Sequence, residues 1–100
     1  MYQIPISGDN ESFTISILGN NYKIQLQWRD IPFNSWGFSI GNESGWLLQG
    51  VSVVFGIDLI KPLSFMNLGF KIVLGCNGKN TGLNQNNFGT TYGLYVIEND

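Results

Sequence analysis

Residues 13–28 read FTISILGNNYKIQLQW, and this stretch decides the fold. Apolar and polar residues alternate in its first arm, FTISI at 13–17, and again in its second arm, YKIQLQW at 22–28. A period of two places successive side chains on opposite faces of a β-strand. Between the arms, the Gly-Asn-Asn of residues 19–21 tolerates positive φ and predicts the turn. The stretch therefore predicts a β-hairpin with one buried face and one wet face.

The rest of the chain repeats this pattern of short strands. Apolar residues alternate at 36–40, a Gly- and Asn-containing turn follows at 41–45, and apolar runs return at 46–48, 51–60, 70–74 and 92–97. Alanine is absent, and Gly, Asn and Ser interrupt the chain at short intervals. We expect a single all-β domain over residues 1–100, a small β-barrel or β-sandwich of about six to eight short, mostly antiparallel strands.

The alternation also predicts the core. On the inward faces of the expected strands we place the following apolar side chains: Phe13, Ile15, Ile17, Ile24, Leu26, Trp28, Phe38, Ile72, Leu74, Leu94 and Val96.

Charge is sparse, with five basic and seven acidic residues and a formal net charge of −2. The basic residues are scattered, whereas a phosphate backbone requires clustered Lys and Arg, so we expect no nucleic-acid binding. No apolar run approaches the ~20 residues that span a membrane, so we expect no membrane partner. The N-terminus lacks the pattern of a signal peptide, which predicts synthesis and residence in a cytoplasm.

The residues that carry most enzyme chemistry are missing. The chain has no histidine, which removes the usual hydrolase triads and the commonest transition-metal ligand. Cys76 is the only cysteine and reads as a small, half-buried residue. Asp58 is the one acid within an apolar segment, where it accepts backbone hydrogen bonds in a turn more often than it acts as a catalytic group. We predict no enzyme activity, no cofactor, no catalytic residue and no metal site.

Residues 51–60 carry apolar side chains at both odd and even positions. A strand in a small β-domain has one inward face, so part of this segment should form an exposed apolar patch. We predict that it lies at or near a subunit interface, formed by these residues: Val51, Val54, Phe55, Ile57, Leu59 and Ile60. The alternative is that the long loop or the N-terminal strand folds over it.

Residues 77–87 form a polar loop in which Leu83 is the only strongly apolar residue, so we expect it to be the most mobile internal segment. Trp46 lies beside a turn, and its ring together with this Asn-rich loop suggests a second function, that of a small carbohydrate-binding module.

Five segments in order resemble one known family. They are MYQIP at 1–5, FTI at 13–15, YKIQLQW at 22–28, GVSVVFGIDLI at 50–60 and NFGTTYGLYVI at 87–97. Together they resemble the baseplate plug proteins of contractile-tailed phages, of the cyanophage type, over essentially the whole chain. Each segment is ordinary strand-and-turn sequence, and the order is what carries the resemblance.

The resemblance implies a structural protein of the virion tail, from a phage or a prophage, at the centre of the baseplate near the hub and the tail tube. It implies contacts with those proteins and a homo-oligomer around the tail axis, with a trimer favoured. It brings no catalytic, cofactor-binding or metal residues.

Overall fold

The computed structural model describes residues 2–30, 34–78 and 82–98. Within these residues the chain forms seven strands and one short 3₁₀ helix, so the expected number of strands is confirmed. The elements in chain order are β1 (Tyr2–Ile4), β2 (Glu11–Ile17), β3 (Asn20–Arg29), β4 (Ser35–Asn42), β5 (Gly45–Ser52), η1 (Lys61–Met66), β6 (Phe70–Cys76) and β7 (Tyr92–Glu98).

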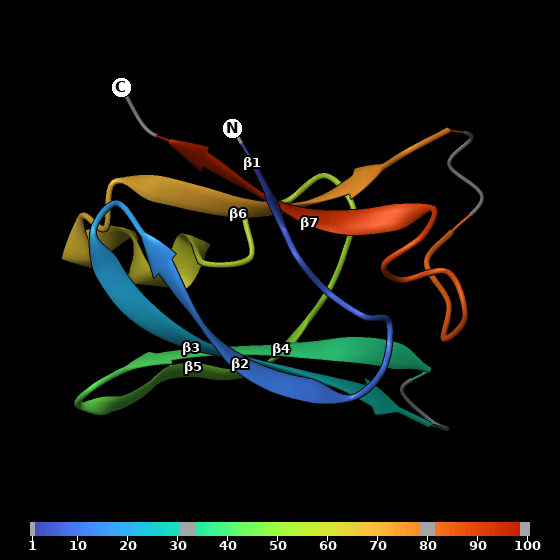
Figure 1. Ribbon diagram of the computed structural model, residues 1–100, viewed down its shortest axis with the longest axis horizontal. Coiled ribbons are helices and arrows are strands. Elements are labelled where there is room, and N and C mark those ends of the chain that lie inside the picture. Colours follow the sequence, from blue (N-terminus) through green and yellow to red (C-terminus); the bar gives the residue numbers. More distant parts are fainter. Residues whose placement is uncertain (1, 31–33, 79–81, 99–100) are drawn as a thin grey trace.

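The strands form two antiparallel sheets that lie face to face (Figure 1). One sheet has four strands in the order β2-β3-β4-β5, and the other has three in the order β1-β7-β6. The all-β prediction is confirmed, and of its two forms the sandwich-like arrangement is the one present, without a closed barrel. The two sheets meet along their apolar faces, because each has one face that must leave water.

The first hairpin pairs Phe13 with Ile24 and Ile15 with Tyr22, as the alternation predicts. Its turn begins earlier than expected: Leu18 and Gly19 have φ of 52° and 82°, while Asn20 and Asn21 already belong to β3. A two-residue turn with positive φ at both positions matches the right-handed twist of the flanking strands. This twist requirement outweighs the low preference of leucine for that conformation.

The core lies between the sheets and contains most of the predicted side chains. Those predicted and buried are Ile17, Ile24, Leu26, Phe38, Ile72, Leu74, Leu94 and Val96. Phe13, Ile15 and Trp28 are only half-buried against this core. The first two lie on the edge strand β2, and Trp28 lies near the end of β3, so each lacks neighbours on one side.

Aromatic side chains outside the predicted set are buried at the two ends of the core. Tyr22 from β3 meets Phe70 from β6 edge-on, with ring centroids 5.4 Å apart, and so joins the two sheets. Trp36, Phe88 and Tyr92 are buried at the other end. Edge-to-face contacts of this kind add specific geometry to the burial of apolar area.

Residues 53–60 connect the two sheets through main-chain bonds. The Val53 amide donates to the Trp36 carbonyl of β4 at 2.9 Å, and the Leu59 amide donates to the Ile72 carbonyl of β6 at 2.8 Å. The Asp58 carboxylate accepts from the amides of Ile60 at 3.1 Å and Ile72 at 3.2 Å. The turn interpretation of Asp58 is therefore confirmed: its charge satisfies backbone donors where the segment meets β6.

The 3₁₀ helix η1 follows this crossing directly. Pro62 is in its first turn, where a missing amide costs nothing, and the Leu63 amide donates to the Ile60 carbonyl at 2.8 Å. Asn67 ends the helix at φ 51°. Among the residues that the structure describes, none of the helical segments is long and apolar enough to span a membrane.

Replacing Asp58 with alanine should lower the free energy of unfolding by about 2 kcal/mol, because the amides of Ile60 and Ile72 lose their shared acceptor. Asp58→Asn keeps one acceptor oxygen and should lose less. Urea denaturation followed by tryptophan fluorescence measures both, with the exposed Glu43→Ala as the matched acidic control. A loss for Asp58→Ala no larger than that of the control would contradict this role.

The stability of the fold should also depend on alkaline pH. Burial raises the pKa of the Tyr22 hydroxyl above its ordinary value of 10.0, and the same effect together with the Glu98 carboxylate raises the pKa of Tyr2. The folded state therefore favours the neutral hydroxyls, so its full stability is present below pH 10.0 and falls as the pH rises beyond it. Tyr22→Phe should reduce this alkaline loss in urea denaturation measured between pH 8 and 11. An unchanged pH dependence in that variant would refute the assignment.

Candidate interaction surfaces

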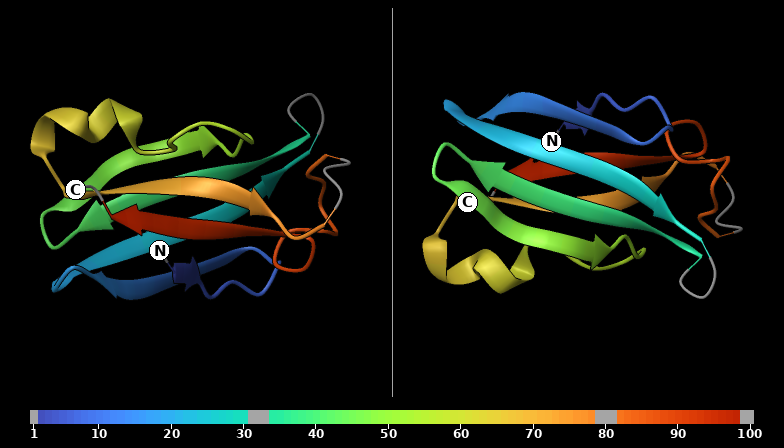
Figure 2. Two further views of the ribbon diagram at one scale, coloured as in Figure 1. Left: turned by 90° about the horizontal axis from the view of Figure 1, so that it is seen from above. Right: turned by 90° about the horizontal axis from the view of Figure 1, so that it is seen from below.

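Residues 53–66 run along one long side of the sandwich, past the edge strands β5 and β6 (Figure 2). Isolated bridges pair Phe55 with Leu74 and Asp58 with Val73, so the segment also covers part of the β6 edge. We call this stretch the side segment. It contains the whole of η1, and Val51, one of the six residues that were predicted as an interface, lies just before it in β5. The other five predicted residues, Val54, Phe55, Ile57, Leu59 and Ile60, fall within 53–66.

One set of side chains in the side segment points inward and closes the gap between the sheets. Its members are Val53, Leu59, Ile60 and Leu63, all of them buried in the core. The prediction that Leu59 and Ile60 are exposed is therefore wrong. The turn at Asp58 directs both side chains between the sheets, so the segment covers its own apolar residues and needs neither the long loop nor the N-terminal strand to do so.

A second set points outward and remains in contact with solvent. Val54, Phe55 and Ile57 are each about half exposed, at 47%, 49% and 46%, and Phe65 and Met66 follow on η1 at 77% and 37%. These five residues are the side patch. They make up five of the eight large exposed hydrophobic side chains in the described part of the chain. Val51 is half-buried and packs against the core from β5.

The sequence pattern did not identify Phe65 and Met66. The signal in the sequence that could have indicated them is Pro62, because proline after an apolar run often lies in the first turn of a helix. In a 3₁₀ helix with about three residues per turn, an inward Leu63 leaves the following residues to face other directions. Within residues 53–66, Lys61 is the only exposed charged side chain, so the side patch is weakly charged.

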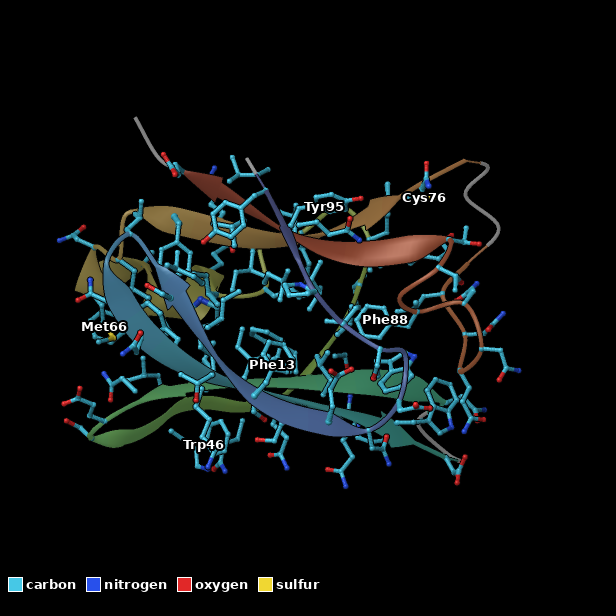
Figure 3. The ribbon with its side chains drawn as sticks, in the orientation of Figure 1. Phe13, Trp46, Met66, Cys76, Phe88 and Tyr95 are labelled. Carbon is cyan, nitrogen blue, oxygen red and sulfur yellow. The ribbon has the colours of Figure 1, made fainter. Side chains whose placement is uncertain are left out.

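Trp46 lies on the outer face of the four-stranded sheet (Figure 3). Its ring packs over Gly41, where a Cβ would lie 3.0 Å from Cε3, and the Lys23 ammonium lies 5.4 Å from the ring centroid. The Asn-rich loop instead contacts Trp36, whose indole Nε1 donates to the Asn84 carbonyl at 3.0 Å. The structure therefore does not bring Trp46 and residues 82–87 of this loop together, because these residues cap the end of the core.

The Asn-rich loop has more anchors than its composition suggests. Residues 79–81 of the predicted mobile segment lie outside the described residues. Beyond them, the Gly82 amide donates to the Tyr92 hydroxyl at 2.7 Å, and Asn87 both accepts from the Asn84 amide and donates to the Gly82 carbonyl. Leu83 packs against the core. The argument that this loop lacks anchors is wrong for residues 82–87, because its Asn side chains bond to the loop's own backbone.

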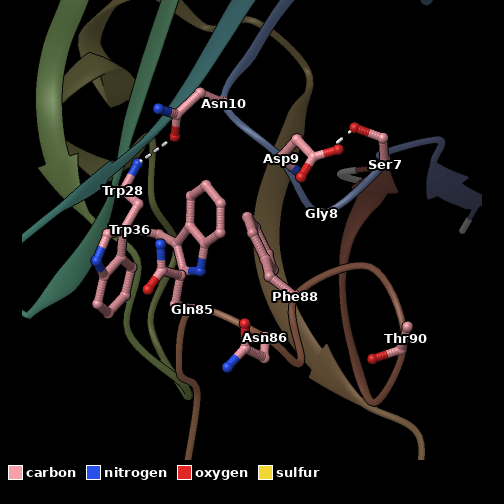
Figure 4. Close-up of a pocket in the computed structure, with 10 residues that line it drawn as sticks. All are labelled: Ser7, Gly8, Asp9, Asn10, Trp28, Trp36, Gln85, Asn86, Phe88 and Thr90. Atoms are coloured by element: carbon pink, nitrogen blue, oxygen red, sulfur yellow. Dashed lines mark hydrogen bonds between the residues drawn. The ribbon is translucent and has the colours of Figure 1, made fainter.

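Beside this loop, a pocket with a volume of about 510 Å³ opens at the end of the sandwich (Figure 4). Four separate parts of the chain line it. They are the connection before β2 (Ser7, Gly8, Asp9 and Asn10), Trp28 of β3, Trp36 of β4, and the loop before β7 (Gln85, Asn86, Phe88 and Thr90). We call it the end pocket. Its rim is polar and its floor is aromatic.

The described residues hold no group of three or more Cys, Asp or Glu side chains arranged for a metal ion. Cys76 is half-buried at the end of β6, with its Sγ 3.5 Å from the Gly78 carbonyl oxygen, as a small structural residue would be. The two candidate surfaces are therefore an apolar one, the side patch, and a polar and aromatic one, the end pocket. Both are suited to non-covalent contacts.

Comparison with known proteins identifies a family for this chain. No curated protein sequence matches the chain. One protein-family model, described as "Cyanophage baseplate Pam3 plug gp18", matches residues 1–99. This match covers every strand of both sheets and confirms the resemblance seen along the sequence. The chain belongs to the cyanophage baseplate plug family.

Proposed function

We propose that this chain is a non-enzymatic structural component of a phage or prophage tail baseplate, and that the side patch is its main contact with another protein of that assembly. Membership of the plug family supports a structural role in the baseplate. The position that we propose is near the hub and the tail tube, in the virion, after synthesis in the host cytoplasm.

The observation that carries this proposal is the exposure of five large apolar side chains along one segment. Phe65 alone leaves most of its ring in water, and full burial of such a ring contributes roughly 1.5–3 kcal/mol. Monomeric proteins rarely keep large contiguous apolar patches exposed, and such patches commonly mark protein contacts. The side patch thus has the character of an interface centre, which polar neighbours would surround.

The same segment is well suited to hold this patch in place. Its inward residues Leu59 and Ile60 are fixed in the core, and its backbone is bonded to β4 and β6. The outward side chains therefore start from a backbone that is already ordered, which lowers the entropy lost when a partner binds.

We propose that the partners are hub and tube proteins together with further copies of this chain, arranged as a homo-oligomer around the tail axis, with a trimer favoured. The net charge of −2 and the scattered basic residues argue for protein partners over nucleic acid. The lack of histidine argues against hydrolytic catalysis of the common kinds.

Substituting Phe55→Lys together with Phe65→Lys should weaken assembly by about tenfold or more, because two ammonium groups would have to lose water at the interface centre. Size-exclusion chromatography with light scattering measures self-association. Co-purification with the hub and tube proteins of the same phage measures hetero-association.

The matched control is Ser12→Lys with Gln27→Lys, which adds the same charge at two exposed positions of the four-stranded sheet. Urea denaturation of both double variants checks that each still folds. If the Phe55/Phe65 variant folds and keeps both kinds of association at the level of the control, the side patch is not the interface.

A further inference from the structure

The end pocket has a built shape, because two glycines let its walls approach. Gly8 has a φ of 89°, and a Cβ there would lie 2.5 Å from the Phe88 carbonyl oxygen. A Cβ at Gly89 would lie 3.1 Å from the Gly8 amide nitrogen. The connection before β2 and the loop before β7 thus touch backbone to backbone, which fixes two sides of the pocket against each other.

Three aromatic rings form the floor. The rings of Trp28 and Trp36 are 5.7 Å apart edge-on, and those of Trp36 and Phe88 are 5.0 Å apart (Figure 4). Both indole N–H groups have partners, since Trp28 Nε1 donates to the Asp30 carboxylate at 2.7 Å and Trp36 Nε1 to the Asn84 carbonyl at 3.0 Å. The floor therefore offers carbon surface, mainly from the half-buried Trp28, and no further donor.

The rim offers polar side chains with unused hydrogen-bonding capacity. The side chains of Asp9, Gln85 and Asn86 make no hydrogen bond to any part of the chain that the structure describes. The Asn10 Oδ1 accepts from the Trp28 amide at 2.8 Å, which orients its amide NH₂ group. One carboxylate and three carboxamides thus surround the aromatic floor, and together they can donate and accept.

We propose that the end pocket binds a short neutral oligosaccharide. Sugar hydroxyls donate and accept hydrogen bonds at once, which matches a mixed rim of carboxylate and carboxamide groups, and the C–H face of a pyranose packs on an indole ring. No Lys or Arg lines the pocket and Asp9 adds negative charge, so an anionic ligand is disfavoured. The volume of about 510 Å³ lies within the range of roughly 300–1,000 Å³ for small-molecule sites.

This proposal is independent of the side patch. In Figure 3, Met66 of the side patch and Phe88 of the end pocket lie at opposite ends of the sandwich. A loss of assembly and a loss of sugar binding can therefore be separated by variants at one site or the other.

The test uses the chain's own tryptophans. Two of the three, Trp28 and Trp36, line the end pocket, while Trp46 lies on the outer face of the four-stranded sheet. In a Trp46→Phe background, fluorescence is titrated with maltotriose, cellotriose and the trimer of N-acetylglucosamine. We expect a saturable change with at least one of them, and ¹H–¹⁵N shift changes confined to residues 7–10, 28, 36 and 84–90.

Gln85→Ala together with Asn86→Ala should weaken that binding about tenfold, the effect of losing hydrogen bonds to two carboxamides. The control, Gln27→Ala with Gln49→Ala, removes two exposed glutamines on the outer face of the four-stranded sheet and should bind as the parent does.

Three results would overturn the proposal. The first is the absence of a saturable response to any of the three sugars up to about 20 mM. The second is equal sugar binding by the Gln85/Asn86 variant and its control. The third is a set of shift changes in the pocket that appears on adding a baseplate protein but not on adding sugars. The last result would make the end pocket a protein contact.

Discussion

The two thin sheets share one core only because residues 53–63 close the side between β5 and β6. Each sheet has one apolar face, and the two faces pack against each other. The sides of this sandwich would be open, and water would reach the apolar faces there. Val53, Leu59, Ile60 and Leu63 fill this side, and the main-chain bonds to Trp36 and Ile72 hold the segment to both sheets. The Asp58 carboxylate satisfies the two amides at the bend and so allows a buried crossing without unpaired donors.

This closure has a direct consequence for the surface. A segment that turns some apolar side chains inward over a few residues must turn others outward, because successive residues of an extended or 3₁₀ backbone face different directions. Phe55 and Phe65 are on the outward side. One short stretch thereby completes the core and presents the side patch.

The opposite end of the sandwich is closed by different means. Trp36 and Phe88 fill the end of the core, and the Asn84 carbonyl accepts from the Trp36 indole. The loop before β7 is thereby drawn over the aromatic rings and ordered by its own Asn side chains. The end pocket results from this arrangement, with the polar loop as its rim and the aromatic core as its floor. The position of the end pocket depends on the hydrogen bond between Trp36 in β4 and Asn84 in the loop, which lie 48 positions apart in the sequence.

The sequence by itself determined the strands, the alternating inward residues and the family, because period-two patterning and turn residues act over a few neighbours and appear directly in the order of residues. It also indicated that the Asp58 carboxylate accepts backbone hydrogen bonds in a turn. Val54, Phe55 and Ile57 were indicated as apolar residues beyond those that one strand face can bury. Only the tertiary structure decided that Leu59 and Ile60 belong to the core, that Phe65 joins the exposed set, and that Trp46 faces away from the Asn-rich loop. The reason is that these outcomes depend on how a connection crosses between two sheets, and such long-range packing leaves no periodic signal in the local sequence.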